Sequence, residues 1–191
     1  MAEIKLDRLL QDLRRQLSDV RFRHVEGVVQ TARDLADRFG VCPSKAEVAA
    51  WLHDFAREWS KDRLLRYVKE HAISLPDEWL TVPLLLHGPV AAHIGKQTYQ
   101  IEDEEILDAV RYHTTGRPNM TDLDLVLFVA DAIEPNRSYP GVEAVRAALT
   151  DGLANAARAS LDNTITYLIA TGRPLGLLAV AARNSLLERG V

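Results

Sequence analysis

Histidine and aspartate residues recur through the first two thirds of the chain at intervals of about one helix plus one loop. The set consists of His24, the adjacent pair His53 and Asp54, His87, His113 and Asp131. This spacing predicts that successive helices each bring one of these side chains to the interior of a helical bundle. A packed interior tolerates so many ionisable groups only if they are hydrogen-bonded, paired or bound to a metal. Four imidazoles and two carboxylates are too many for one cation and suit two.

The pair His53-Asp54 lies in an apolar stretch, residues 49–57, that contains no Gly or Pro. We therefore expect a helix that continues to about Arg57. Taken alone, such a pair is typical of a hydrogen-bond network in which the carboxylate faces an arginine, and this alternative stays open for it. Asp131 lies in a helix that is apolar on all sides, so its carboxylate also needs a strong partner. The ordered set carries more weight than any single member.

Helical signals cover the remainder of the chain, and we find no convincing strand. The expected helices are residues 4–17, 20–39, 44–57, 61–70, 90–97, 103–112, 123–133, 142–170 with a break near Gly152, and a last one ending near Arg189. Ser18, Ser44 and Thr121 are expected to begin helices, Ser44 in a capping box with Glu47, and Gly40 to end one. The fold class is an all-α bundle. We expect one domain over residues 1–191, with a core at about 20–141 on which the terminal helices pack.

Composition and charge exclude several classes of protein. The net charge of −4, without any basic run, argues against general nucleic-acid binding. No apolar run approaches the roughly 20 residues of a membrane span. The charged N-terminal stretch lacks the apolar region of a signal peptide, and the single Cys42 cannot form an internal disulfide. We therefore expect a cytoplasmic protein without a membrane partner.

With its flanking residues, the ordered set resembles the HD superfamily of metal-dependent phosphohydrolases. Within that superfamily it is similar to the YqeK branch, the symmetrical bis(5′-nucleosyl)-tetraphosphatases. The resemblance rests on Arg23-His24, on Leu-His-Asp-Phe-Ala at 52–56, on Leu-His-Gly-Pro-Val at 86–90, on Arg-Tyr-His-Thr-Thr-Gly-Arg at 111–117 and on Ala-Asp-Ala-Ile-Glu-Pro-Asn-Arg at 130–137. The last two stretches are the most specific.

The resemblance implies an HD-domain bundle that holds two divalent metal ions. Iron is expected, with manganese, cobalt or zinc as alternatives. One ion would be held by His24, His53, Asp54 and Asp131, and the other by His87 and His113, with Asp54 bridging them. The implied reaction cleaves diadenosine tetraphosphate into two ADP through a hydroxide that bridges the metals.

Other residues receive implied roles in catalysis or substrate binding. Asp54 and Arg57 are the catalytic candidates, although the family usually has lysine where this chain has Arg57. The candidates for substrate contacts are Thr114, Thr115, Gly116, Arg117 and Arg137. For Arg117 and Arg137 a structural ion pair is an equally supported alternative.

Two other functions remain open from the sequence. The first is an HD phosphohydrolase that acts on another nucleotide or nucleoside polyphosphate. The second is a helical binding module that metals stabilise. The alanine-rich region from Val142 could also supply the surface of a homodimer.

Overall fold

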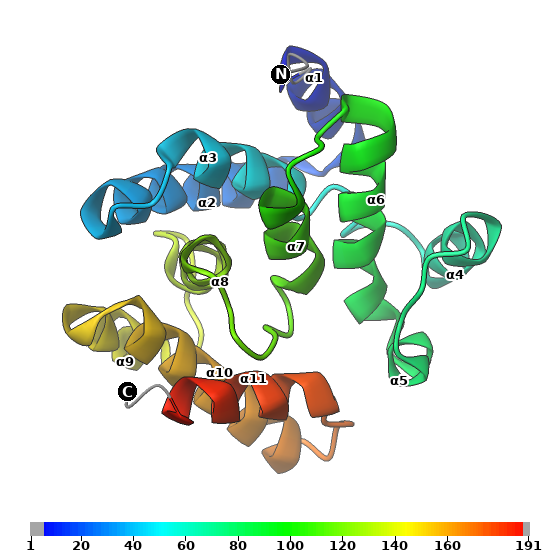
Figure 1. The fold of residues 1–191 in the computed structure, drawn as a ribbon. Coiled ribbons are helices and arrows are strands. Elements are labelled where there is room, and N and C mark those ends of the chain that lie inside the picture. The colour runs from blue at the N-terminus through cyan, green and yellow to red at the C-terminus, as the bar shows by residue number, and fades with distance from the viewer. Residues whose placement is uncertain (1–5, 189–191) are drawn as a thin grey trace.

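The computed structural model describes residues 6–188, and within that range the chain forms helices and no strand (Figure 1). The elements are α1 (Leu6–Gln16), α2 (Asp19–Phe39), α3 (Pro43–Leu52), α4 (Lys61–Glu70), α5 (Asp77–Thr81), the 3₁₀ turn η1 (Pro83–Leu86), α6 (His87–Tyr99), α7 (Glu104–Tyr112), α8 (Asp122–Ile133), α9 (Val142–Ala148), the 3₁₀ turn η2 (Leu149–Asp151), α10 (Leu153–Ala170) and α11 (Leu177–Glu188). The all-α prediction is confirmed.

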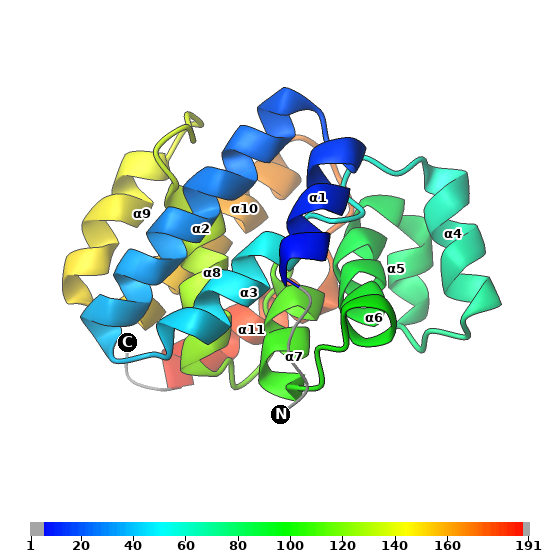
Figure 2. The same cartoon turned by 90° about the horizontal axis from the view of Figure 1, so that it is seen from above.

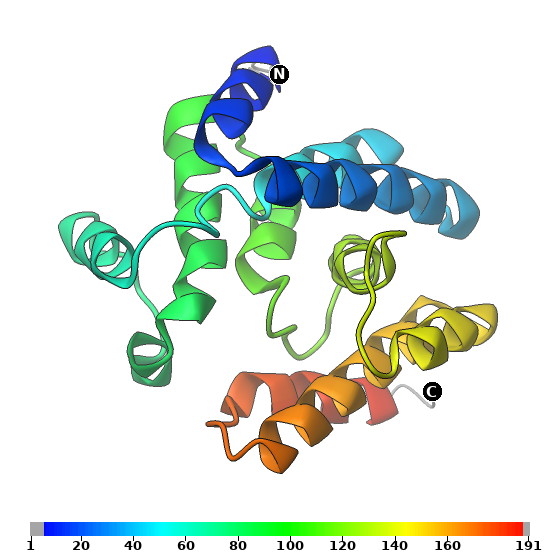
Figure 3. The same cartoon turned by 180° about the vertical axis from the view of Figure 1, so that it is seen from behind.

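Helix α8 lies at the centre of the arrangement. It is apolar around its circumference, and each residue from Leu123 to Ala130 is buried. Helices α2 and α3 cover one side of it, and α9, α10 and α11 lie on the other (Figures 1 and 3). A helix without a polar face can be stable in water only when neighbours cover it on all sides. The composition of α8 thus accounts for the three layers.

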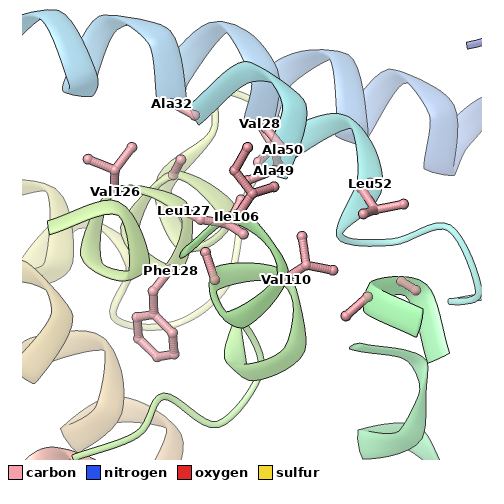
Figure 4. Close-up of a cluster of buried hydrophobic side chains, with 14 of the residues drawn as sticks. Val28, Ala32, Ala49, Ala50, Leu52, Ile106, Val110, Val126, Leu127 and Phe128 are labelled. Carbon is pink, nitrogen blue, oxygen red and sulfur yellow. The ribbon is translucent and has the colours of Figure 1, made fainter. Parts of the chain in front are cut away.

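The core between α2, α3, α7 and α8 is built from small and branched side chains. Val28 and Ala32 of α2, Ala49 and Ala50 of α3 and Val126 of α8 belong to one buried cluster (Figure 4). All five are buried. The alanines let the helix axes approach, which brings together the helix ends that carry the ionisable residues.

Helices α1 and α4–α6 form the other part of the bundle. Helix α6 packs along α7, whereas α4 packs on η1 and α6, away from α8 (Figure 2). Helix α1 buries Leu9 and Leu13 and contacts α2, α3 and α6. At its end, the Gln16 side-chain amide donates a hydrogen bond to the Phe55 carbonyl oxygen at 3.1 Å. This bond ties α1 to the turn that follows α3.

The structure corrects both ends of the helix expected at residues 44–57. Helix α3 ends at Leu52, and residues 53–58 form turns, so the pair His53-Asp54 follows the helix instead of lying inside it. Ser44 does not cap this helix, because Cys42 occupies the N-cap position without a side-chain bond.

The alanine-rich region at 142–170 is two helices, α9 and α10, separated by η2 and Gly152. Ser18, Gly40 and Thr121 cap helices as expected. Of the predicted terminal helices, Ile4, Lys5 and Arg189 lie outside the described residues.

Between residues 6 and 188, no helix combines the length and apolar character needed to cross a membrane. Large apolar side chains are exposed near the junction of α10 and α11, at Tyr167, Ile169 and Leu177. The homodimer, the cytoplasmic location and the single-domain extent stay predictions.

The stability of the junction between η2 and α10 should depend on a glycine at position 152. Its φ of 117° and ψ of 167° lie in a region that is essentially restricted to glycine. Gly152→Ala meets no atom within 4 Å, so its cost should be backbone strain alone, about 1–3 kcal/mol in the free energy of unfolding. Urea unfolding measures this cost. Gly176→Ala, at a glycine without positive φ and with only one contact at 3.9 Å, is the matched control and should be near neutral.

Candidate metal centre

Six side chains from five separate segments meet at one centre. His24 comes from α2, His53 and Asp54 from the turn after α3, His87 from the start of α6, His113 from the end of α7 and Asp131 from α8. The four histidines and Asp54 are buried, and the Asp131 side chain is 20% exposed. The structure thus brings together all six residues predicted to bind metal.

The two oxygens of Asp54 face different histidines. Its Oδ2 lies 3.7 Å from His24 Nε2 and 3.6 Å from His53 Nε2. Its Oδ1 lies 3.3 Å from His87 Nε2 and 3.8 Å from His113 Nε2. A carboxylate placed between two sets of imidazoles has the arrangement of a bridging ligand.

Asp131 completes the first of these groups. Its Oδ1 lies 3.1 Å from His24 Nε2 and 4.0 Å from His53 Nε2. His24, His53 and Asp131 each offer a ligand atom within 4.8 Å of the other two. The same holds for His53, Asp54 and His113. On the far side of Asp54, the Nε2 atoms of His87 and His113 are 3.0 Å apart.

Hydrogen bonds to the nearby backbone orient the rings of three of the histidines. Their Nδ1 atoms bond to the carbonyl three residues earlier, at 2.6 Å for His53, 2.5 Å for His87 and 2.7 Å for His113. Each histidine stands at a helix end, where carbonyls lack a partner within the helix. Because Nδ1–H donates to a carbonyl, Nε2 keeps its lone pair and points into the centre.

His24 is oriented by Glu134, a residue to which the sequence analysis gave no role. His24 Nδ1 lies 3.1 Å from Glu134 Oε1, and Glu134 is 1% exposed. The other carboxylate oxygen accepts bonds from the backbone and side-chain nitrogens of Asn136. Gly27 makes this approach possible, since a Cβ there would lie 2.5 Å from Glu134 Oε2. The signal that could have revealed Glu134 is its position directly after the apolar helix that carries Asp131.

The electrostatics favour the ligating protonation states of His53, Asp54, His113 and Asp131. Burial lowers the pKa of His53, and burial with the nearby His87 and His53 lowers the pKa of His113 to about 3. Burial alone would raise the pKa of Asp54, but the surrounding histidines hold that pKa well below its usual range. The pKa of Asp131 is likewise lowered, against the effect of burial, by His24 and Arg137. Neutral imidazoles and ionised carboxylates are the ligating forms.

One buried polar atom at the centre lacks a hydrogen-bond partner within residues 6–188. His53 Nε2 is fully buried and has no hydrogen-bond partner among the described residues. Leaving a buried polar atom unpaired is costly, and a cation coordinated by Nε2 removes that cost. The orphaned nitrogen and the purely nitrogen and oxygen donor set therefore fit divalent transition metals.

Cationic side chains surround a cavity of about 170 Å³ that opens onto the centre. Its walls include Asp54, His87, His113, Thr114, Asp131 and three arginines, Arg21, Arg57 and Arg137. Arg21 donates to Asp54 Oδ2 at 3.1 Å, and Arg137 donates to the carboxylate and carbonyl oxygens of Asp131 at 2.5 and 2.8 Å. The Arg57 guanidinium forms no hydrogen bond or ion pair within residues 6–188.

Arg21 is the second functional residue missed by the sequence analysis. It stands three residues before His24 and therefore lies on the same face of α2. That spacing is the signal that could have identified it.

Some of the residues predicted to bind substrate are not brought to this cavity. Arg117 forms ion pairs with Asp108 and Asp124, both at 2.8 Å, which is the structural alternative considered for it. The Thr115 hydroxyl donates to the Gly116 carbonyl oxygen, and the Gly116 N–H donates to the Tyr112 carbonyl oxygen at 2.7 Å. These groups already have partners, whereas Thr114 lines the cavity.

A helical bundle that gathers His, His-Asp, His, His and Asp around one central carboxylate defines a class of metal-binding hydrolases. The family model described as the HD domain matches residues 21–136. The chain belongs to the HD-domain family, so the prediction of this superfamily is confirmed.

Relatives and a solved structure agree with this assignment. The chain is 42% identical over 178 residues to a symmetrical bis(5′-nucleosyl)-tetraphosphatase of Halalkalibacterium halodurans, covering 93% of this chain and 95% of that one. It is 41% identical over 164 residues to the Bacillus subtilis enzyme of the same name, covering 85% and 87%. A crystal structure from Clostridium acetobutylicum, described as a predicted HD superfamily hydrolase involved in NAD metabolism, matches with a TM-score of 0.92 at 34% identity, covering 97% of this chain and 98% of that one.

Glu134→Gln should weaken metal binding without unfolding the protein. The amide keeps the shape of the side chain but removes the charge that supports His24 as a ligand. Loss of such a supporting carboxylate typically lowers metal affinity about 10- to 100-fold. Competition with a chromophoric chelator measures the affinity, and the exposed Glu143→Gln is the control. Equal affinities for both variants and the parent would contradict the role given to Glu134.

The metal-free protein should lose stability as the pH falls below about 6.5. In the unfolded chain His53 and His113 take up protons near that pH, whereas the folded state holds them neutral, His113 down to about pH 3. The unfolded state then binds more protons, so stability is complete above pH 6.5 and falls below it, by up to about 1.4 kcal/mol per pH unit for each histidine. Urea unfolding with a chelator at pH 7.5 and 5.5 tests this. The stability of His113→Asn should depend less steeply on pH. An equal urea midpoint of the parent protein at both pH values would contradict the prediction.

Proposed function

We propose that this protein hydrolyses dinucleoside tetraphosphates symmetrically, with diadenosine tetraphosphate giving two ADP. The observation that carries the proposal is the match, over nearly the full length of both chains, to relatives named for this reaction. Membership of the HD-domain family and the six converging side chains support it.

The proposed cofactor is a pair of divalent cations, with iron favoured and manganese, cobalt or zinc as alternatives. His24, His53 and Asp131 would hold one cation, and His87 and His113 the other, with one oxygen of Asp54 toward each. When bound, two such cations supply Lewis acidity, neutralising phosphate charge and making a water molecule nucleophilic near neutral pH.

The reaction adds the elements of water across the central phosphoanhydride. The oxygen of water forms a bond to one of the two central phosphorus atoms. The bond from that phosphorus to the bridging oxygen breaks, and the bridging oxygen leaves as part of the second ADP. Both products are thus ADP, and only one of them carries the oxygen atom from water.

The arginines of the cavity suit a polyanionic substrate. Arg57 is half-buried and lacks a partner within the described range, so a phosphate oxygen would satisfy a desolvated guanidinium. Arg137 holds Asp131 through two bonds and also reaches within 3.5 Å of His24 Nε2. We therefore assign Arg57 to phosphate binding and Arg137 to positioning Asp131 as well as binding phosphate. Thr114 is a hydroxyl donor beside His113, at 3.2 Å from its Nε2.

Product analysis with metal analysis tests the proposed function. We expect two metal ions per chain and ADP as the sole nucleotide product of diadenosine tetraphosphate. In water labelled with ¹⁸O, half of the ADP should carry one label. AMP with ATP would refute the symmetrical cut, and turnover confined to another nucleotide would favour the alternative HD phosphohydrolase. A folded Asp54→Ala protein with unchanged activity would instead support a binding module.

Arg57→Ala should lower kcat/KM about 100-fold, because an arginine that meets developing phosphate charge acts like other preorganised donors of the transition state. Metal content should not change, since Arg57 contacts none of the six proposed ligands through a hydrogen bond or ion pair. Arg66→Ala, at an exposed position of α4, is the control. Unchanged kinetics in Arg57→Ala would remove this residue from the site.

A further inference from the structure

The cavity at the six ligands is too small to hold a nucleotide. Its volume of about 170 Å³ lies below the range of roughly 300–1,000 Å³ that is typical of small-molecule sites. It can accommodate the phosphates at the cut, but a nucleoside must extend beyond it. The neighbouring surface therefore decides where each half of a dinucleotide binds.

A second cavity, of about 360 Å³, adjoins the first. It lies between the first turns of α2 and the loop after α8, and we call it the α2–α8 cavity. Its walls include Val20, Arg21, Arg23, Asn136 and Arg137. Arg21 and Arg137 also line the smaller cavity, so the two spaces share a cationic wall.

The charge of the α2–α8 cavity favours an anion. Three guanidinium groups face it, and the one carboxylate in its wall, Glu134, is already bonded to His24 and Asn136. Arg23 is exposed and has no ion pair or hydrogen bond within residues 6–188. Its charge is therefore available to a ligand, in a protein whose net charge is −4.

The cavity also offers an apolar surface beside the arginines. Val20, in the first turn of α2, is 71% exposed. Burying such a side chain under a planar base would remove apolar surface from water. A cationic wall next to an apolar one matches the two ends of a nucleotide.

We propose that the α2–α8 cavity binds one nucleoside diphosphate half of the substrate, with its phosphates on Arg21 and Arg137 and its nucleoside toward Val20 and Arg23. The inference rests on the proposed function, because it supposes a substrate that extends from the metal centre on both sides. The other half leaves the small cavity on the side of Arg57.

Charge reversal at Arg23 tests the electrostatic part of the inference. Arg23→Glu should raise the KM for diadenosine tetraphosphate about tenfold and leave kcat within about twofold, because Arg23 lies outside the small cavity. It should weaken ADP binding, measured by calorimetry on the metal-loaded protein, by a similar factor. Arg66→Glu is matched in residue type and exposure, and Arg66 likewise has no hydrogen bond or ion pair within residues 6–188, so this variant should change neither value.

Filling the α2–α8 cavity tests whether the nucleoside occupies this space. Val20→Trp should raise KM and weaken ADP binding because the larger ring occupies the space of the nucleoside. Since Val20 is exposed, the substitution disturbs no core packing, and circular dichroism should show a parent-like fold. Ile169→Trp, at a position 66% exposed near the end of α10, controls for a surface tryptophan.

The outcomes separate this inference from the proposed function. If the parent yields two ADP but both variants keep its KM and its affinity for ADP, the cavity is not the subsite and the inference is overturned. If the parent does not cleave diadenosine tetraphosphate but both variants bind ADP more weakly than their controls, the proposed function fails and the nucleotide site stands. If ADP binds the parent and all four variants equally, the inference is overturned whatever the activity.

Discussion

The metal centre depends on hydrogen bonds made by Nδ1 of three histidines, the ring nitrogen that faces away from the centre. His53, His87 and His113 each stand at a helix end and each bond through Nδ1 to the carbonyl three residues earlier. A free carbonyl at a helix end and an imidazole that must be fixed in one tautomer satisfy each other. The ligand geometry is therefore encoded locally, at the end of each helix, and tertiary packing only has to bring those ends together.

Close contact between helices supplies that second requirement. Gly88, directly after His87, lies against the last turn of α7, where a Cβ would approach the Arg111 carbonyl oxygen to 2.8 Å. This contact brings His87 up to His113. Gly27 serves the same purpose on α2, where it leaves room for the carboxylate that orients His24. Both glycines are needed because of the space they leave free, and a larger residue at either would displace part of the centre.

Local signals predicted the helices better than they predicted the site. Gly40 and Thr121 mark helix ends through their own chemistry, so their roles could be read from the sequence. Residues 53–58 contain neither Gly nor Pro, so no strong helix breaker marks the end of α3 in the sequence. The six proposed ligands could be predicted because their types and order form a pattern. The ion-pair partners of Arg117 and the contact between Glu134 and His24 could not, because they depend on which side chains meet in three dimensions.

The bonds from Arg21 to Asp54 and from Arg137 to Asp131 affect the balance of charge in the folded protein. A cluster of buried carboxylates would normally oppose collapse of the chain until cations arrive. Here the guanidinium groups of Arg21 and Arg137 lie beside two of those carboxylates as fixed counter-ions. The chain itself therefore neutralises part of the negative charge at the centre, which lowers the electrostatic cost of packing these carboxylates together in one bundle.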